Sequence, residues 1–194
     1  MAAASTLVLS GMPSPATQGA AFNVTVTARD PHGNVATGYS GTVHVTSTDG
    51  AAVLPANFTL VNGVGTFAVT FNTLGNQTLT ITDTANSSIS GSATVGVAPI
   101  APSNLAATVV SGRQIMLTWT DNSSTETGIN VERSTDGIHW TVIASLGPNA
   151  TSYLDSGLRK HATYYYRVVA FYTNPDLSIL YSAYSGVVNA TARR

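Results

Sequence analysis

Apolar residues alternate with Thr, Ser and Asn over most of this chain, and this period of two constrains its fold more than any other feature. Phe22, Val24 and Val26 alternate with polar residues, and the segments 67–71 and 79–82 repeat the pattern. Successive side chains of a strand point to opposite faces, so the pattern predicts half-buried strands. Threonine favours strands and keeps an outer face hydrated. Because no segment supports a helix of useful length, the sequence predicts an all-β chain.

Two dipeptides consist of residue types that are favoured in tight turns. Asn62-Gly63 and Asp136-Gly137 each stand between two strand-like segments. Both central residues of a two-residue hairpin turn need positive φ, which Asn, Asp and Gly tolerate. We expect a two-residue hairpin turn at each dipeptide.

The length and one proline-containing segment predict two domains. A chain of 194 residues accommodates two sandwiches of about 100 residues each. Pro99 and Pro102 follow a strand-like segment, and proline fixes φ and restricts the residue before it. We therefore predict domains at residues 1–98 and 99–194, joined by a short semi-rigid spacer.

The second half resembles a bacterial-type fibronectin type III domain from Pro102 to Ala192. The resemblance implies that Trp119 points into the core and that Leu158 and Tyr164 form a tyrosine corner, in which the hydroxyl bonds back to the chain. Lys160 stands where this family usually has proline. The matching strands are Ile115–Trp119, Gly128–Gly137 with its turn, Ser152–Leu158, Tyr164–Ala170 and a last strand that opens at Ser182–Ser185.

The first half resembles the immunoglobulin-like repeats of bacterial surface proteins. The residues that carry this resemblance are Ala28–Asn34, Tyr39–Val43 and Leu54–Phe58. Such repeats serve as spacers and adhesive stalks, and the resemblance implies the same here. The expected fold class is all-β, with two tandem immunoglobulin-like and fibronectin type III β-sandwiches.

Composition limits the cellular locations and the classes of binding partner that the chain can have. Only 9% of residues are charged, against about 25% in an average soluble protein, so solubility must come from Thr, Ser, Asn and Gly. The net charge of −1 offers no basic field for nucleic acid, and no apolar run is long enough for membrane insertion. Cysteine is absent. We expect an extracellular or cell-surface protein, and a chain that is a mature fragment or a piece of a longer protein.

No arrangement of residues predicts catalysis or a cofactor. The four histidines are scattered over turns, one polar strand face and a corner, as expected of solvated surface residues. Glu126 and Glu132 have no evident acid partner for glycoside hydrolysis, and no nucleophile elbow or phosphate-binding loop occurs. We predict that the chain is not an enzyme. The histidines are His32, His44, His139 and His161.

Calcium is the one metal whose ligands the predicted loops contain. Asp30, Asp49 and Asp83 lie near predicted strand ends, and Asp121-Asn122 opens a loop in the second half. None follows the spacing of a calcium loop, and Asp and Asn are common turn residues. The sequence therefore predicts no metal site.

One loop and one strand face are candidates for an interaction surface. The loop before the last strand is apolar, and loops at the ends of sandwiches often carry binding residues. In one interpretation Leu177, Ile179 and Leu180 fold back over the core or pack on the neighbouring domain; in the other they contact a partner. The candidate residues are Leu177, Ile179, Leu180, Tyr181, Tyr165 and Phe171.

Three functional hypotheses follow. The first is a non-catalytic structural or adhesive module pair of a prokaryotic surface or secreted protein, acting as a semi-rigid spacer. The second is a self-assembling subunit of an extracellular fibre or surface layer. The third is an accessory module, able to bind glycans, of a secreted polysaccharide-degrading enzyme. The expected partner is a protein or glycan at the cell surface, or a second copy of the chain.

Overall fold

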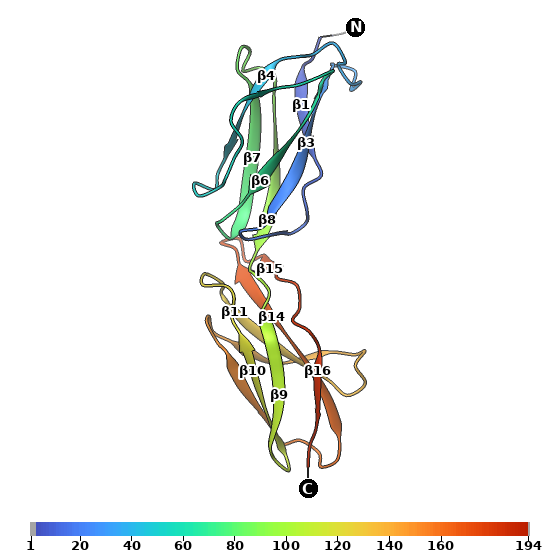
Figure 1. The fold of residues 1–194 in the computed structure, drawn as a ribbon, viewed down its shortest axis with the longest axis vertical. Coiled ribbons are helices and arrows are strands. Elements are labelled where there is room, and N and C mark those ends of the chain that lie inside the picture. The colour runs from blue at the N-terminus through green and yellow to red at the C-terminus, as the bar shows by residue number, and fades with distance from the viewer. Residues whose placement is uncertain (1–2, 194) are drawn as a thin grey trace. The chain divides into compact units, whose positions relative to one another are not determined.

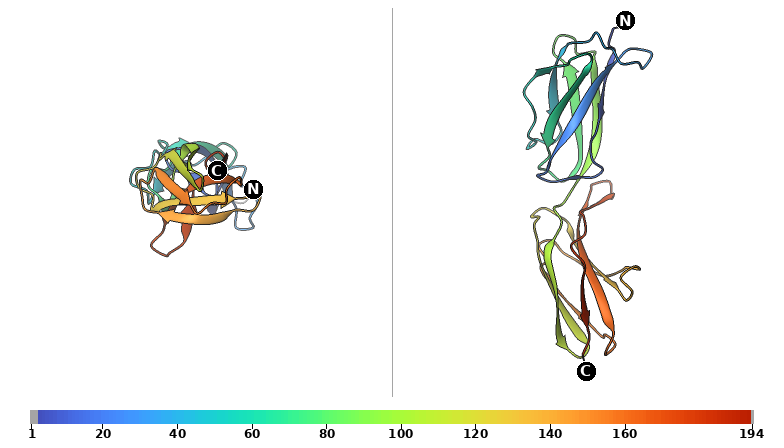
Figure 2. Two further views of the ribbon diagram at one scale, coloured as in Figure 1. Left: turned by 90° about the horizontal axis from the view of Figure 1, so that it is seen from below. Right: turned by 45° about the vertical axis from the view of Figure 1, so that its right-hand side comes forward.

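The computed structural model describes residues 3–193, which form strands, turns and loops (Figure 1). The chain divides into two compact units, Met1–Val97 and Ala98–Arg194. The facing sheets of each unit can be followed in Figures 1 and 2. The all-β prediction is confirmed. The described residues include no helix that is long and apolar enough to cross a membrane.

Unit 1 is a sandwich of a three-stranded and a five-stranded sheet. The three-stranded sheet has the order β1-β3-β6, and the five-stranded sheet has the order β2-β8-β7-β4-β5. The strand pairs β1-β3, β3-β6, β4-β5, β4-β7 and β7-β8 are antiparallel. The strands are β1 (Thr6–Ser10), β2 (Ala16–Thr17), β3 (Ala21–Arg29), β4 (Thr42–Ser47), β5 (Phe58–Thr59), β6 (Val64–Thr70), β7 (Gly75–Asp83) and β8 (Ser90–Ala98).

The alternation in the sequence decides which side chains of unit 1 face its core. Val24 and Val26 of β3 are fully buried, whereas Phe22 is half-buried and packs on Phe71 with ring centroids 5.8 Å apart. The opposite sheet contributes buried residues at the same period of two. These are Val43 and Val45 of β4 and Leu79 and Ile81 of β7.

Unit 2 has a fibronectin type III-like arrangement of strands. One sheet has the order β13-β10-β9, and the other has the order β12-β11-β14, with β15 and β16 both pairing with β14. The strands are β9 (Ser103–Ser111), β10 (Gln114–Thr120), β11 (Gly128–Ser134), β12 (Thr141–Leu146), β13 (Ser152–Ser156), β14 (Thr163–Thr173), β15 (Ile179–Tyr181) and β16 (Val188–Thr191).

The core of unit 2 contains the residues that the resemblance placed there. Trp119 is 5% exposed, and it lies in the same buried cluster as Leu158, Tyr164 and Tyr166. The Tyr164 hydroxyl accepts a hydrogen bond from the Arg159 amide at 3.1 Å, so the predicted tyrosine corner is present.

The last strand of unit 2 differs from its prediction. It does not open at Ser182, because residues 182–187 separate β15 from β16. Two serine hydroxyls explain the interruption. Ser182 Oγ accepts the amide of Ala170, and Ser185 Oγ accepts the amide of Val168. Side-chain oxygens thus take amide donors of β14 that a regular ladder would pair with backbone carbonyls.

One of the two predicted hairpin turns is confirmed. Asn62 and Gly63 have φ values of 51° and 77°, and Val61 pairs with Val64 across them. This is the left-handed conformation that a two-residue turn with matching strand twist requires.

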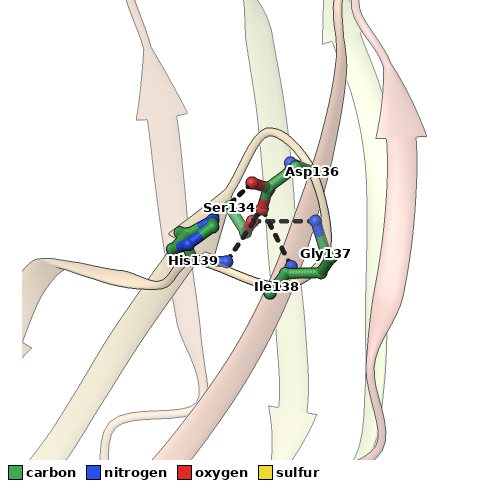
Figure 3. Close-up of polar contacts among 5 residues, drawn as sticks. All are labelled: Ser134, Asp136, Gly137, Ile138 and His139. Carbon is green, nitrogen blue, oxygen red and sulfur yellow. Dashed lines mark hydrogen bonds and ion pairs between the residues drawn. The ribbon is translucent and has the colours of Figure 1, made fainter.

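The prediction of a two-residue turn at Asp136-Gly137 is wrong, since β11 and β12 are joined by residues 135–140. Two side chains bind the backbone of this loop instead (Figure 3). Ser134 Oγ accepts the amides of Asp136 and Gly137, and Asp136 Oδ1 accepts those of Ile138 and His139. These bonds stabilise a wider loop than the dipeptide predicts.

A close backbone contact joins the two sheets of unit 1. Gly91 of β8 lies so near to β1 that a Cβ atom built on it would be 1.7 Å from the carbonyl oxygen of Leu7. Only glycine permits this approach of one backbone to another. The backbone of β1 in one sheet is therefore packed directly on the backbone of β8 in the other sheet.

The Gly91→Ala variant tests this contact. We expect it to destabilise unit 1 by about 3 kcal/mol, because the methyl group forces β1 and β8 apart. The measurement is denaturant unfolding followed by circular dichroism. Gly50→Ala is the matched control, since a Cβ atom at Gly50 meets nothing within 4 Å. Equal stability of the two variants would contradict the contact.

Candidate interaction surface

The predicted apolar loop is the hairpin between β14 and β15, and it exposes its apolar residues. Leu177 is 79% exposed, Ile179 is 46% exposed and Tyr181 is 45% exposed, whereas Leu180 is half-buried. The interpretation that Leu177 and Ile179 fold back over the core is therefore wrong. The hairpin pairs Thr173 with Ile179 and Phe171 with Tyr181.

Polar side chains hold the tip of this hairpin in a strained conformation. Leu177 has a φ of 67°, which is unfavourable for a branched side chain. Asp176 Oδ1 accepts the amide of Ser178 at 2.9 Å and its hydroxyl at 2.6 Å. Asn174, which is 4% exposed, donates from Nδ2 to Ser178 Oγ at 3.0 Å. A defined turn thus displays the Leu177 side chain to solvent.

Arg167 is the centre of an aromatic cluster on unit 2. Its guanidinium carbon lies 4.3 Å from the centroid of the Trp140 ring and 3.6 Å from that of the Tyr184 ring. Glu132 accepts hydrogen bonds from Arg167 at 2.7 Å and from the Tyr184 hydroxyl at 3.0 Å. Burial, followed by this bond to Glu132, raises the pKa of Tyr184. The stacked cation and its carboxylate fix both rings in place.

A second ring pair extends this cluster along the sheet. Phe171 and Tyr181 face each other across β14 and β15 with ring centroids 6.3 Å apart. Phe171 has the same strand parity as Arg167, so both side chains lie on one face of the sheet. We call this surface the aromatic face, defined by Trp140, Phe171, Tyr181 and Tyr184.

The sequence identified this surface in part. Phe171 and Tyr181 were among the candidate residues, and both belong to this face. Tyr165, a third candidate, lies on β14 with Phe171 and Arg167 and is half-buried. The roles of Trp140 and Tyr184 were missed, because both belong to irregular segments whose direction no periodicity predicts. The available signal was Glu132 opposite Arg167, since opposite charges pair across neighbouring strands.

A second arginine pair lies inside unit 2 and has a structural role. Arg133 donates to both oxygens of Asp155 at 3.0 Å, and the Tyr166 hydroxyl donates to the same carboxylate at 2.8 Å. Asp155 is 3% exposed. Burial, followed by the bond to Asp155, raises the pKa of Tyr166. This network ties β13 to the opposite sheet.

Asp49 illustrates how an acidic residue of unit 1 holds loops together through hydrogen bonds to its carboxylate. It is 3% exposed, and its carboxylate accepts the amides of Ala51, Asn72 and Thr73 at 2.7–3.0 Å, together with the Thr73 hydroxyl at 2.7 Å. Burial raises the pKa of Asp49, but these four bonds outweigh it and hold the pKa below its ordinary value. One carboxylate thereby joins the loop after β4 to the loop after β6.

The other acidic side chains are bonded in similar ways. Asp83 accepts the Tyr39 hydroxyl and the amides of Ala85 and Asn86, and its pKa is lowered by these bonds, the Tyr39 bond first. Each acidic side chain accepts at least one hydrogen bond from the chain. The full set is Asp30, Asp49, Asp83, Asp121, Glu126, Glu132, Asp136, Asp155 and Asp176.

Ser134, Asp136 and His139 have the residue types of a catalytic triad without its geometry (Figure 3). His139 Nδ1 lies 2.6 Å from Asp136 Oδ2, but Ser134 Oγ donates to Asp136 at 2.9 Å rather than to the histidine. The serine oxygen also accepts two loop amides. This chemistry requires a base that removes the serine proton, and Ser134 directs its proton to Asp136 instead of His139.

A depression lies beside this loop. It has a volume of about 260 Å³ and is lined by Arg133, Ser134, Thr135, His139 and Thr141. All four histidines of the chain are exposed, as the sequence predicted. Within residues 3–193 no group of three or more His, Cys, Asp or Glu side chains is placed to hold a metal ion.

Comparisons with known proteins yield structural likenesses only. No family model and no curated protein matches the chain. The FN1–FN3 domains of chicken CNTN1 are 14% identical and cover 95% of this chain and 69% of theirs, with a TM-score of 0.44. Domains A168–A170 of titin are 18% identical, with coverages of 96% and 64% and a TM-score of 0.40. The sixth fibronectin type III domain of human fibronectin type III domain containing protein 3 is 21% identical, with coverages of 48% and 84% and a TM-score of 0.39. The fold assignment therefore rests on the strand order of the chain itself.

Acid should destabilise unit 1 through its loop carboxylates. The pKa values of Asp30, Asp49 and Asp83 are all lowered in the folded chain. Their contribution to stability is complete above the ordinary pKa and is lost as pH falls below about 4. At pH 7 we expect Asp49→Ala to cost unit 1 about 3 kcal/mol and to flatten this pH dependence. Circular dichroism during denaturant unfolding measures both effects.

Tryptophan fluorescence provides the internal control for this experiment. Both tryptophans, Trp119 and Trp140, belong to unit 2. The fluorescence transition should be the same in the Asp49→Ala variant and in the original chain. An Asp49→Ala variant as stable as the original chain at pH 7 would show that the carboxylate does not hold these loops.

Proposed function

We propose that the two units are non-catalytic structural or adhesive modules of an extracellular, prokaryotic surface or secreted protein. One observation carries this proposal: each acidic side chain accepts a hydrogen bond from the chain's own loops or side chains. Catalysis by acid and base needs a carboxyl or imidazole group free to reach a substrate proton. The low charge and the Thr-rich sheets agree with an exported protein, and the absence of cysteine permits that location.

The segment between the units supports a semi-rigid spacer as the specific role. β8 ends at Ala98 and β9 begins at Ser103. Two of the four residues between them, Pro99 and Pro102, have a fixed φ, and each restricts the residue before it. A short connection of this composition limits the bending of a polypeptide.

Stretching a single molecule tests the structural role. Pulled from its two ends, the chain should lengthen in two abrupt steps of about 300 Å each, since about 90 residues per unit extend by about 3.5 Å each. Gly91→Ala should lower the force of one step only, because it affects unit 1 alone. Gradual lengthening at low force, without steps, would contradict a mechanical role for the two units.

A glycan-binding accessory module is the second candidate, and the aromatic face favours it. Tyr181 and Tyr184 are each 45% exposed, and the Arg167 guanidinium, bonded to Glu132, lies over the rings of Trp140 and Tyr184. Flat rings with a few fixed polar groups are typical of small-molecule sites, and sugars offer apolar ring faces as well as hydroxyl groups.

Affinity electrophoresis through gels containing soluble xylan, hydroxyethyl cellulose or glycol chitin tests the second candidate. If the aromatic face binds a glycan, at least one of these polymers should retard the chain. Tyr184→Ala should then reduce the binding at least tenfold. Ile138→Ala is the control, because Ile138 is 75% exposed and lies outside the aromatic face. No retardation in any gel, or equal retardation of both variants, would contradict this candidate.

The self-assembling subunit is supported less directly. Exposed Leu177 and Ile179 at the hairpin tip could pack on a second copy of the chain. Strand addition beside β15 and β16 is disfavoured, however, because residues 182–187 interrupt that edge. We therefore place this candidate after the other two.

A further inference from the structure

The loop between β10 and β11 encloses oxygen atoms that have no partner. Asp121 Oδ2, Ser123 Oγ and Glu126 Oε2 are closed off from solvent, and none of them makes a hydrogen bond of regular geometry. Within residues 3–193, three of the four buried unpartnered side-chain atoms belong to this one loop; the fourth is Trp119 Nε1. Buried polar atoms without partners are rare, and such a concentration indicates that a ligand completes the site.

The remaining oxygens of the two carboxylates are fixed by the backbone. Asp121 Oδ1 accepts the Ser123 amide at 3.1 Å, and Glu126 Oε1 accepts the Asn149 amide at 2.7 Å. The second bond joins this loop to the loop between β12 and β13. The backbone therefore holds one oxygen of each carboxyl group, while the other oxygen has no hydrogen bond of regular geometry.

The unbonded oxygens lie close together. Burial raises the pKa of Asp121, and the neighbouring Glu126 carboxylate raises it further. The hydrogen bond from the Ser123 amide lowers this pKa but does not outweigh the other two effects. Burial also acts on Glu126, but the Asn149 amide and the nearby Ser123 and Asp121 side chains lower its pKa. These mutual effects are those of side chains within hydrogen-bonding reach of one another, so the three side chains lie near each other. Ser123 is 8% exposed and Glu126 is 4% exposed, so the point of convergence is buried.

The charge at this point decides what kind of ligand fits. The ion pairs of the described residues include neither Asp121 nor Glu126. A buried water would supply hydrogen bonds but no positive charge. A shared proton would neutralise only one of the two carboxylates. A divalent cation balances both charges at once.

The donor atoms decide which cation fits. All three are oxygens, and the loop has no His or Cys, the ligands that zinc and copper sites favour. Magnesium requires near-ideal octahedral geometry, whereas calcium accepts six to eight oxygens in irregular arrangements. We propose that the β10–β11 loop is a calcium site, in which Asp121, Ser123 and Glu126 supply side-chain ligands. Backbone carbonyls and water would supply the other ligands.

Calcium at this position would hold two loops of unit 2 together, because Glu126 is already bonded to Asn149. Affinities of calcium sites in extracellular modules are about 10⁻⁴–10⁻³ M. Binding to the folded chain alone should raise the melting temperature of unit 2 by about 5 °C when calcium exceeds Kd about tenfold.

Thermal unfolding of the full chain at pH 7, in calcium chloride or in EDTA, tests the proposal. Tryptophan fluorescence reports unit 2 alone, because Trp119 and Trp140 are the only tryptophans. We expect calcium to raise this transition in the original chain and in Asp176→Asn, a control that changes a loop carboxylate outside the site. In Asp121→Asn the calcium effect should disappear.

Direct titration keeps the test decisive if a variant does not fold. Calorimetric titration of the original chain with calcium should show one site per chain, with Kd in the range given above. No heat of binding, together with equal melting temperatures in calcium chloride and EDTA, would overturn the proposal.

Discussion

Hydrogen bonds from loop amides to carboxylates hold the ends of both sandwiches in place. Only nine residues of the chain are acidic, and each accepts at least one hydrogen bond from the chain itself. A hydrogen bond to a charged acceptor is worth more than one between neutral groups, so a few carboxylates can hold loops that the sheets alone leave free. Asp49 is the clearest case, because its four bonds join two loops that follow different strands.

The strands and the buried faces could be predicted from the sequence because they depend on local patterns. Alternation identified Val24 and Val26 as core residues, since in a strand the direction of a side chain follows from its position alone. In the second half, the resemblance to a known domain family placed Trp119 in the core and Tyr164 in its corner correctly. The turn at Asn62-Gly63 was predictable because few residue pairs tolerate two positive φ values.

The errors occurred where side chains bind backbone or meet across irregular segments. The Asp136-Gly137 dipeptide predicted a tight turn, but Ser134 and Asp136 stabilise a wider loop through four amides. Ser182 and Ser185 interrupt the last strand through bonds to β14 that no periodicity reveals. The position of Arg167 between Trp140 and Tyr184 depends on two segments without regular structure, so the aromatic face was only partly anticipated.

The interrupted last strand also affects what happens when many such units are crowded together. An unbroken edge strand offers a row of free amides and carbonyls on which another chain can build a continuous intermolecular sheet. Here that edge consists of the three residues of β15 and the four residues of β16. A misfolded neighbour finds only short, discontinuous templates on this side of the sheet. Repeated copies of this unit could therefore be concentrated on one surface, or arranged in series, with little tendency to coalesce into amyloid-like aggregates at this edge.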